Sequence, residues 1–283
     1  MPCYSLSRHK DVLVPANLVL FDRCCAENDF SYTTGLASGN NIQEAVTHAL
    51  YEVIERHIED IVHWNKVKIP TVPVESINDR SLLKLICSIE KAGESRLVIS
   101  SCTEEFKIPA FRVFAYPLKG PFPASYAYYT SLGVHLDKTV ALSRALTELV
   151  QGQVCSRYRV SKGFNKTPLV KEFPRCIMSF FSDVIDEKRL SPFSSITSMA
   201  RDDFRDDLLL LKAILEDRGA EILVRDLTHP EIGIRTVRVI VRGLHPGNFG
   251  VSIVDLMHKA ARISPFLGSY SQLTRAIKHM PLT

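Results

Sequence analysis

The stretch GNNIQEAVTHALYEVIER (39–56) recurs as a pattern in VHLDKTVALSRALTELVQG (134–152). Each follows a glycine-containing segment, GLASGNN or SLGVHLD, and then places apolar residues at i, i+3, i+4 and i+7. This periodicity predicts two amphipathic helices, each entered from a turn. The shared pattern A-x3-A-L-x-E-x2-[E/Q] pairs Glu52 with Glu148 and Glu55 with Gln151. The helix and its acids are therefore duplicated together.

A second pair of segments also matches. Residues 82–115 align without a gap with residues 208–241, so that Gly93 aligns with Gly219, Val98 with Val224 and Val113 with Val239. Each copy predicts a helix, a C-capping glycine, a strand, a turn and a second strand. Further strands are predicted at 12–21 and 127–134, and a late helix at 251–263.

These elements predict an α/β (α+β) fold in which internally duplicated helix-strand-strand modules surround mixed sheets. A pseudo-twofold arrangement would bring the two acid-bearing helices together. The basic, aromatic and poorly periodic segment 153–195 is either an insertion lying over a site or an ordinary long connection.

Composition excludes several classes of protein. The chain of 283 residues is 46% hydrophobic and 23% charged, which is typical of a globular protein. Seven scattered cysteines show neither a disulfide framework nor CxxC pairs. The net charge of +4 is dispersed without a basic stripe, so no nucleic-acid partner is expected. No apolar run is long enough to span a membrane and no signal peptide is evident, so we expect a soluble, cytoplasmic protein without a membrane partner.

The first helix concentrates polar groups on one face. His48, Glu52, Glu55 and Glu59 follow i, i+4, i+7 and i+11 spacing. One interpretation is a solvated stripe in which Glu52 pairs with Arg56, as Glu148 would pair with Arg144, each worth a few tenths of a kcal/mol. A surface stripe has no reason to keep acids at matched positions in two copies, whereas a site between the copies does. Glu59 lies outside the matched pattern and is expected to be a solvated charge.

The kinds of residue in the matched pattern indicate the ligand. Carboxylates and an amide without histidine or cysteine favour a hard cation such as Mg²⁺, which commonly completes its shell with nucleotide phosphates. Arg56 would then bind phosphate oxygens as a bidentate clamp. Neither GxxxxGK[ST] nor GxGxxG is present, so any nucleotide site differs from a P-loop or a Rossmann crevice.

Three long blocks closely resemble the signature blocks of the YcaO family: TTGLASGNNIQEAVTHALYEVIER, SLGVHLDKTVALSRALTELVQ and VRDLTHPEIGIRTVRVIVRGLHP. The resemblance implies the YcaO fold and an ATP site with several Mg²⁺ ions. It assigns ATP binding to two motifs, E-x2-E-R (Glu52, Glu55 and Arg56) and E-x2-Q (Glu148 and Gln151). Mg²⁺ would be held by the three glutamates of these motifs.

The resemblance also implies an activity. Family members use ATP to activate a peptide backbone amide, which a side chain or external sulfide attacks, giving an azoline ring or a thioamide. Catalysis is then mostly positioning and charge neutralisation, and no nucleophile of the enzyme itself is required. The implied partners are a peptide or protein substrate and a protein that delivers the substrate or supplies sulfur. A homodimer is an open alternative.

The chain departs from the family pattern in four ways. It begins inside the pattern, so we expect residues 1–283 to form a single YcaO-like domain shortened at its N-terminus. His48 stands where relatives often carry serine, and Arg235 and Arg242 stand where they usually carry proline. The end, AIKHMPLT, lacks the proline-rich tail of ring-forming members, which favours thioamide chemistry or an accessory role. His48, His135 and Arg242 are secondary site candidates.

A rival interpretation assigns no catalysis to the chain. It would be a shortened relative that binds a leader peptide or an enzyme, for example an accessory factor for modification of a ribosomal protein. A decayed fragment without function is a third alternative.

Overall fold

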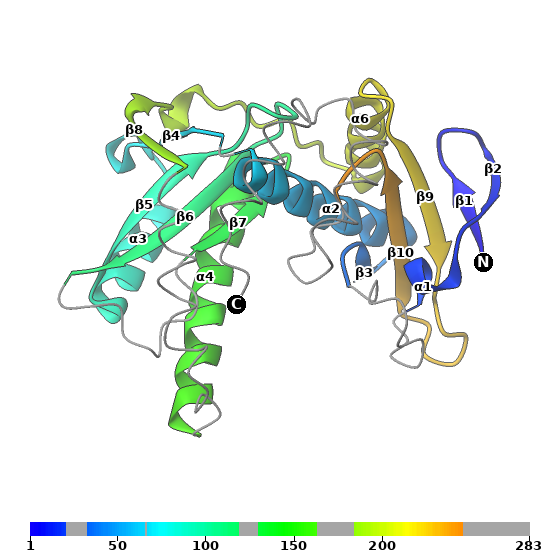
Figure 1. The fold of residues 1–283 in the computed structure, drawn as a ribbon, viewed down its shortest axis with the longest axis horizontal. Coiled ribbons are helices and arrows are strands. Elements are labelled where there is room, and N and C mark those ends of the chain that lie inside the picture. The colour runs from blue at the N-terminus through cyan, green and yellow to red at the C-terminus, as the bar shows by residue number, and fades with distance from the viewer. Residues whose placement is uncertain (21–32, 66, 119–129, 163–183, 246–283) are drawn as a thin grey trace, which may run out of the picture. The chain divides into compact units, whose positions relative to one another are not determined.

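The computed structural model describes residues 1–20, 33–65, 67–118, 130–162 and 184–245. The chain divides into two compact units, residues 1–60 with 201–283, and residues 61–200. Each unit is built on one five-stranded sheet (Figure 1). The predicted α/β fold is confirmed.

The sheet of the first unit has the strand order β2-β1-β9-β10-β3, and all its pairings are antiparallel. The described elements of this unit are β1 (Pro2–Ser5), β2 (Lys10–Leu13), α1 (Ala16–Val19), β3 (Leu36–Gly39), α2 (Ile42–Trp64, whose last four residues fall in the second unit), α6 (Phe204–Glu216), β9 (Glu221–Asp226) and β10 (Arg235–Arg242).

The sheet of the second unit has the order β7-β6-β5-β4-β8, and it is mixed because β4 and β8 are parallel. Its described elements are β4 (Ile69–Thr71), η1 (Val74–Ser76), α3 (Arg80–Gly93), β5 (Ser95–Ser101), β6 (Ala110–Pro117), β7 (Thr130–Val134), α4 (Lys138–Ser161), β8 (Ile185–Leu190) and η2 (Phe193–Ser195).

The two sequence duplications are parts of one larger repeat. In the second unit the chain runs α3-β5-β6-β7-α4, with β5, β6 and β7 antiparallel neighbours. In the first unit the matching order is α6-β9-β10-β3-α2. This order exists only in space, because β3 and α2 precede α6 in the chain and β3 pairs antiparallel with β10. The repeat is thus continuous in one unit and permuted in the other.

The ungapped alignment of the two copies is wrong by one residue in the first strand. Val113 pairs with Ile99, and its counterpart Val239 pairs with Val224, so Val224 corresponds to Ile99 and not to Val98. In the second copy, the connection from the helix to the first strand is therefore one residue shorter, and the connection from the first strand to the second is one residue longer. Helix endings differ too. Gly219 has the left-handed φ of +72°, but in the first copy Glu94 takes the left-handed position and Gly93 is the last helical residue.

The strand predicted at 12–21 is largely wrong. Strand β2 ends at Leu13, and the short helix α1 begins after Pro15, whose missing N–H cannot continue a strand ladder. Within the strand predicted at 127–134, β7 covers Thr130–Val134. The helix predicted at 251–263 lies outside the described residues. In segment 153–195, residues up to Ser161 continue α4, residues 163–183 lie outside the described part, and β8 and η2 follow.

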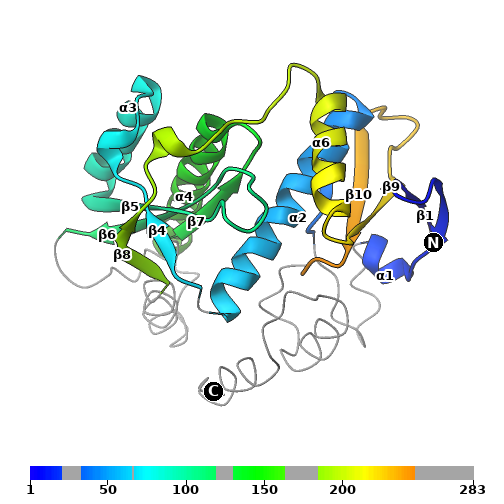
Figure 2. The same ribbon diagram turned by 90° about the horizontal axis from the view of Figure 1, so that it is seen from above.

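Each unit buries its core between its sheet and two helices (Figure 2). In the second unit, α3 and α4 lie on the same side of β5 and β6, and Phe111, Leu142 and Leu146 are fully buried there. In the first unit, α2 and α6 lie on one side of β9 and β10, where Val237 and Val239 are buried. Short helix α1 covers the other side, packing Val19 against Leu223.

Candidate active site

Helix α2 is fixed at its start by side-chain caps. The amide of Glu44 donates to Asn41 Oδ1 at 2.8 Å, and the amide of Asn40 donates to Glu44 Oε2 at 2.9 Å. These bonds satisfy donors that a helix N-terminus leaves unpaired. The polar turn NN therefore begins the helix at a defined residue, which sets the faces on which the later acids fall.

The acids from Glu55 onward in α2 are more buried than the acids before them. His48 is exposed and Glu52 is half-buried, whereas Glu55 is 3%, Asp60 5% and Glu59 8% exposed. The expectation of a solvated Glu59 is therefore wrong, because tertiary packing covers this end of the helix. Buried carboxylates are costly unless charges or hydrogen bonds compensate them.

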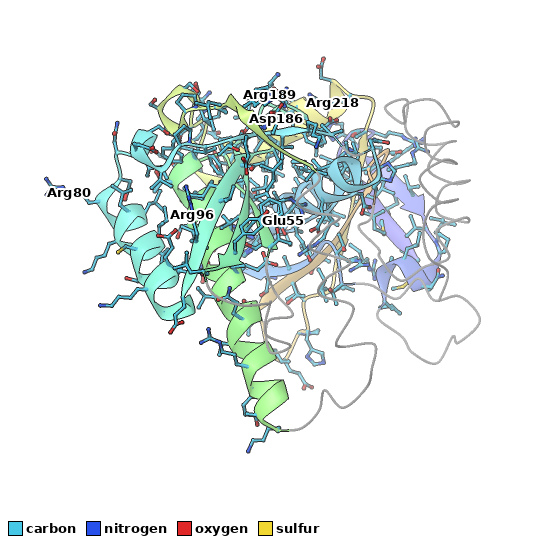
Figure 3. The ribbon with its side chains drawn as sticks, turned by 60° about the vertical axis from the view of Figure 1, so that its left-hand side comes forward. Glu55, Arg80, Arg96, Asp186, Arg189 and Arg218 are labelled. Carbon is cyan, nitrogen blue, oxygen red and sulfur yellow. The ribbon has the colours of Figure 1, made fainter. Side chains whose placement is uncertain are left out.

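Arg56 compensates two of these acids. Its Nη2 lies 3.2 Å from Glu55 Oε1, and its Nη1 donates to Glu59 Oε2 at 2.8 Å. The side chain of Arg56 is 29% exposed, against 4% for Glu55 and 11% for Glu59. Glu55 is labelled on α2 in Figure 3. Arg56 therefore bridges two largely buried carboxylates, Glu55 of the E-x2-E-R motif and Glu59, which follows the motif by one helical turn.

Glu52 is oriented by the main chain. The amide of Gly35 donates to Glu52 Oε2 at 3.0 Å. Gly35 has a left-handed φ of +82°, and an added Cβ would stand 2.1 Å from the carbonyl oxygen of Val239. Only glycine fits this position, so the loop before β3 holds the carboxylate through a backbone donor that no side chain replaces.

The second acid-bearing helix, α4, is capped by a side chain and packs closely against strand β7. The amides of Thr139 and Val140 donate to Asp137 Oδ1, at 2.8 and 2.9 Å, which caps α4. Ser131 Oγ donates to the carbonyl oxygen of Ala145 at 2.6 Å. At Gly133, an added Cβ would stand 2.3 Å from the carbonyl oxygen of Ala141. Strand β7 thus touches the backbone of α4 directly.

On α4, Glu148 is half-buried and Gln151 is exposed, at i and i+3. The structure therefore places Glu52, Glu55 and Arg56 together on α2, and Glu148 with Gln151 on α4. The joining of the two sets in one site stays a prediction.

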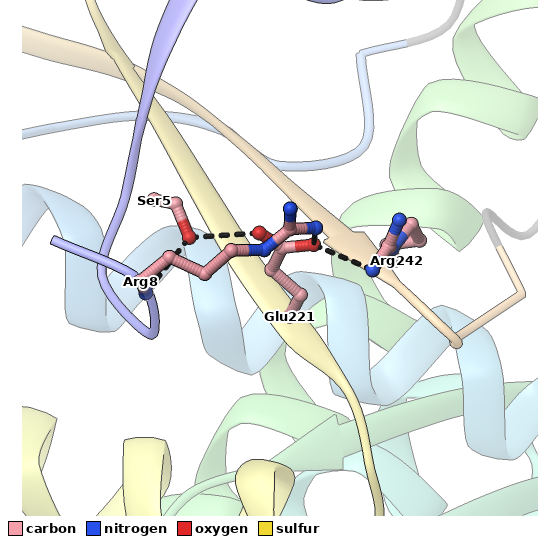
Figure 4. A network of polar contacts seen from close by, with 4 residues as sticks. All are labelled: Ser5, Arg8, Glu221 and Arg242. Atoms are coloured by element: carbon pink, nitrogen blue, oxygen red, sulfur yellow. Dashed lines mark hydrogen bonds and ion pairs between the residues drawn. The ribbon is translucent and has the colours of Figure 1, made fainter. Parts of the chain in front are cut away.

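The secondary candidates occupy other environments. His135 Nδ1 accepts from the amide of Asp137 at 2.9 Å and so supports the turn into α4. Arg242 Nη2 lies 2.8 Å from Glu221 Oε2, and Arg8 pairs with the same oxygen (Figure 4). Ser5 Oγ donates to the other oxygen at 2.8 Å. Burial raises the pKa of Glu221, but the bonds from Arg8 and Ser5 and the charge of Arg242 outweigh it and lower the pKa overall.

A histidine pair on the first unit was missed in the sequence. His57 is fully buried, and its Nδ1 accepts from the amide of His245 at 2.9 Å. The two rings stack with centroids 5.2 Å apart. Burial, with His245 and Arg218, lowers the pKa of His57 to about 3, and burial lowers the pKa of His245 to about 4. The signal available was that His57 continues the apolar spacing of Leu50 and Ile54 at i, i+4 and i+7.

The donor set fits Mg²⁺ bound together with a nucleotide. Among the described residues, no group of three or more His, Cys, Asp or Glu side chains is arranged to hold a metal ion. Mg²⁺ usually takes only one or two carboxylates and completes its shell with phosphates and water. Two carboxylates suit such a shared shell. Glu52 is held by the backbone amide of Gly35, and Glu55 contacts Arg56, whose guanidinium is a common phosphate ligand. No helix in the described part of the chain is long and apolar enough to cross a membrane.

Comparison with known proteins also indicates a family that binds ATP and Mg²⁺. A family model described as YcaO cyclodehydratase, ATP- and Mg²⁺-binding, matches residues 1–245. An uncharacterised protein of Methanothermobacter thermautotrophicus is 28% identical over 251 residues, which cover 85% of this chain and 63% of that protein. The ribosomal protein S12 methylthiotransferase accessory factor YcaO of Escherichia coli is 23% identical over 265 residues, covering 86% of this chain and 40% of that protein.

A solved structure shares the fold. The structure of YcaO from Methanopyrus kandleri bound with AMPPCP and Mg²⁺ matches with a TM-score of 0.70 and 21% identity, covering 87% of this chain and 65% of that one. The chain spans from 24% to 63% of the length of the curated relatives it matches. The family match covers most of the chain, including both acid-bearing helices. The chain therefore belongs to the YcaO cyclodehydratase family, whose members bind ATP and Mg²⁺.

Proposed function

We propose that this chain is an ATP- and Mg²⁺-dependent enzyme that activates a backbone amide of a peptide or protein to install an azoline or a thioamide. The observation that carries the proposal is the family match over residues 1–245, which includes both acid motifs. Residues 1–283 would act as a single YcaO-like domain in the cytoplasm, with a partner protein that delivers the substrate or supplies sulfur. Within segment 153–195, an insertion would be confined to the residues between the end of α4 at Ser161 and the start of β8 at Ile185, because α4 and β8 are parts of the second unit. A homodimer is compatible with this role.

In this proposal the two acid-bearing helices serve one site. Glu52, Glu55 and Glu148 hold Mg²⁺, Gln151 contributes to nucleotide binding, and Arg56 binds phosphate oxygens. A planar guanidinium suits this role because it offers paired donors to phosphate. Bound Mg-ATP would supply the phosphoryl group that turns an amide oxygen into a good leaving group.

The burial of the acids supports a functional role. Glu55, Asp60 and Glu59 are 3%, 5% and 8% exposed within six residues of one helix. Replacing buried ionic groups with apolar residues is often neutral or stabilising, so a fold gains little from keeping three acids there. A cation and a polyphosphate nearby would give these charges a purpose. The Arg56 side chain remains 29% exposed, so its guanidinium is accessible to a phosphate group.

Isothermal titration calorimetry with ATP and Mg²⁺ tests the proposal. The wild-type chain should bind, and Glu52→Gln or Glu148→Gln should weaken binding at least about tenfold, which corresponds to roughly 1.4 kcal/mol. Glu75→Gln, which changes an exposed glutamate in η1, is the matched control and should leave binding unchanged. Absence of binding by a folded wild-type chain, alone and with proteins encoded beside it, would refute the enzymatic role.

An accessory role is the second candidate. The similarity to an E. coli protein named as an accessory factor favours it. In this role the chain would bind a leader peptide or an enzyme, for example one that modifies a ribosomal protein, without turning over ATP. Nucleotide-independent binding of such a partner, with unchanged affinity in Glu52→Gln, would favour this role over catalysis.

A further inference from the structure

Arg56 is shared between two carboxylates that have different expected roles. It contacts Glu55 at 3.2 Å and Glu59 at 2.8 Å, using different terminal nitrogens. Glu55 belongs to the E-x2-E-R motif, whereas Glu59 follows it by one helical turn and lies outside the motif. The shorter contact, which is also a hydrogen bond, is the one to Glu59.

The two contacts would respond differently to a metal ion. If Glu55 holds Mg²⁺, the cation competes with Arg56 for the same carboxylate, because both are attracted to its oxygens. The contact between Arg56 and Glu59 does not involve that carboxylate and can persist. Charge-assisted hydrogen bonds of this kind are about twice as strong as neutral ones. Glu59 therefore has the geometry to keep Arg56 in place while Glu55 changes partner.

We propose that Glu59 is a positioning residue that holds the Arg56 guanidinium for phosphate binding and draws it away from Glu55 when Mg²⁺ arrives. This inference rests on the proposed function, because it requires that the chain binds Mg-ATP. Glu59 itself touches neither the metal nor the nucleotide. Its effect reaches the ligand only through Arg56.

The inference predicts two effects of Glu59→Gln. The amide keeps the size of the side chain but loses the charge, so Arg56 is held less firmly and shifts toward Glu55. The dissociation constant for ATP at saturating Mg²⁺ should rise about fivefold, the size expected for weakening one charged hydrogen bond. The Mg²⁺ concentration that half-saturates ATP binding should rise as well, because Arg56 now competes more strongly at Glu55.

A double-mutant cycle separates positioning from simple stabilisation. The dissociation constant for ATP and the Mg²⁺ requirement would be measured for wild type, Glu59→Gln, Arg56→Lys and the double variant. Because Glu59 acts through Arg56, Glu59→Gln should have almost no further effect when Arg56 is already replaced. The control is Glu216→Gln, which removes an ion pair of the same 2.8 Å length, with Lys212 on α6, and should leave both measurements unchanged.

The possible results are distinct. An unchanged affinity and Mg²⁺ requirement in Glu59→Gln, or an equal loss with and without Arg56, overturns the positioning role while leaving the proposed function intact. A wild-type chain that binds no Mg-ATP overturns both. Circular dichroism checks that Glu59→Gln is folded, and if it is not, Glu59→Asp, which keeps the charge but moves it back by one methylene, replaces it in the cycle.

Discussion

Replacing Gly133 by alanine should force strand β7 and helix α4 apart. The new Cβ would stand 2.3 Å from the carbonyl oxygen of Ala141 and 2.6 Å from the amide nitrogen of Ala145. Ordinary van der Waals contact begins at 3.4 Å, so the helix would have to retreat by about 1 Å. Both atoms belong to the helix backbone, which cannot rotate away as a flexible side chain can.

The expected loss of stability follows from this geometry. Overpacking typically costs about 1–3 kcal/mol, and a clash with backbone atoms belongs at the upper end of that range. The retreat would also stretch the 2.6 Å bond between Ser131 and the carbonyl oxygen of Ala145. A loss of about 3 kcal/mol lowers the Tm of a domain of this size by about 6–12 °C. Because α4 carries Glu148 and Gln151, the affinity for Mg-ATP should fall as well.

Differential scanning calorimetry measures the shift in Tm, and a control variant separates the steric clash from backbone strain. Gly233 has a left-handed φ of +74° but no atom within 4 Å of an added Cβ. Gly233→Ala therefore introduces backbone strain alone, at about 1 kcal/mol. If Gly133→Ala melts within a degree or two of Gly233→Ala, the close approach of β7 to α4 is not a constraint on the fold and the reasoning fails.

Three further predictions concern the first unit. Glu221→Ala should lower the free energy of unfolding, measured in urea, by about 2 kcal/mol, because it leaves the buried Ser5 hydroxyl without its acceptor. Arg242→Ala is the control and should cost less than about 1 kcal/mol, because the Arg242 side chain is 63% exposed. Equal losses in the two variants would contradict the role of Glu221 in this network. His245→Asn should flatten the acid destabilisation of the fold. The pKa of His245 is lowered to about 4 in the folded protein, so as the pH falls the unfolded chain takes up a proton at this side chain before the folded one does. The contribution of His245 should therefore lower wild-type stability by roughly 1.4 kcal/mol per pH unit from about pH 6.5 towards pH 4. Urea unfolding at a series of pH values measures this loss. Gly35→Ala should lower both Tm and Mg-ATP affinity, since it displaces the amide that holds Glu52; a normal affinity in calorimetry would show that this amide is dispensable.

The helices could be predicted from sequence because their signals are local. Apolar spacing and a polar turn mark both α2 and α4, and Asn41 and Asp137 cap them. The matched acids were visible for the same reason, since a duplicated pattern needs no knowledge of the fold. Strand register was less accessible. Val98 and Ile99 are both apolar, so alternation does not say which of them faces the helices, and a one-residue slip passes unnoticed.

The missed features depend on residues far apart in the chain. The burial of Glu59 is set by tertiary packing, which the pattern of a single helix does not contain. The contact of His57 with His245 joins positions 188 residues apart. Pro15 was a local signal, and its missing N–H should have ended the strand predicted at 12–21. Hydrophobic residues on both sides of Pro15 do not replace the missing ladder donor.

The permuted repeat has a consequence for how the protein is made. The second unit is one continuous run, 61–200, so its strands and helices can assemble as soon as that run has left the ribosome. The first unit must wait, because β3 pairs with β10, whose residues are synthesised about 200 positions later. At about 5–20 residues per second, the apolar face of α2 remains without its sheet for roughly 10–40 seconds. Helix α2, with the acids proposed to bind Mg²⁺, therefore needs protection from aggregation on the nascent chain during this time.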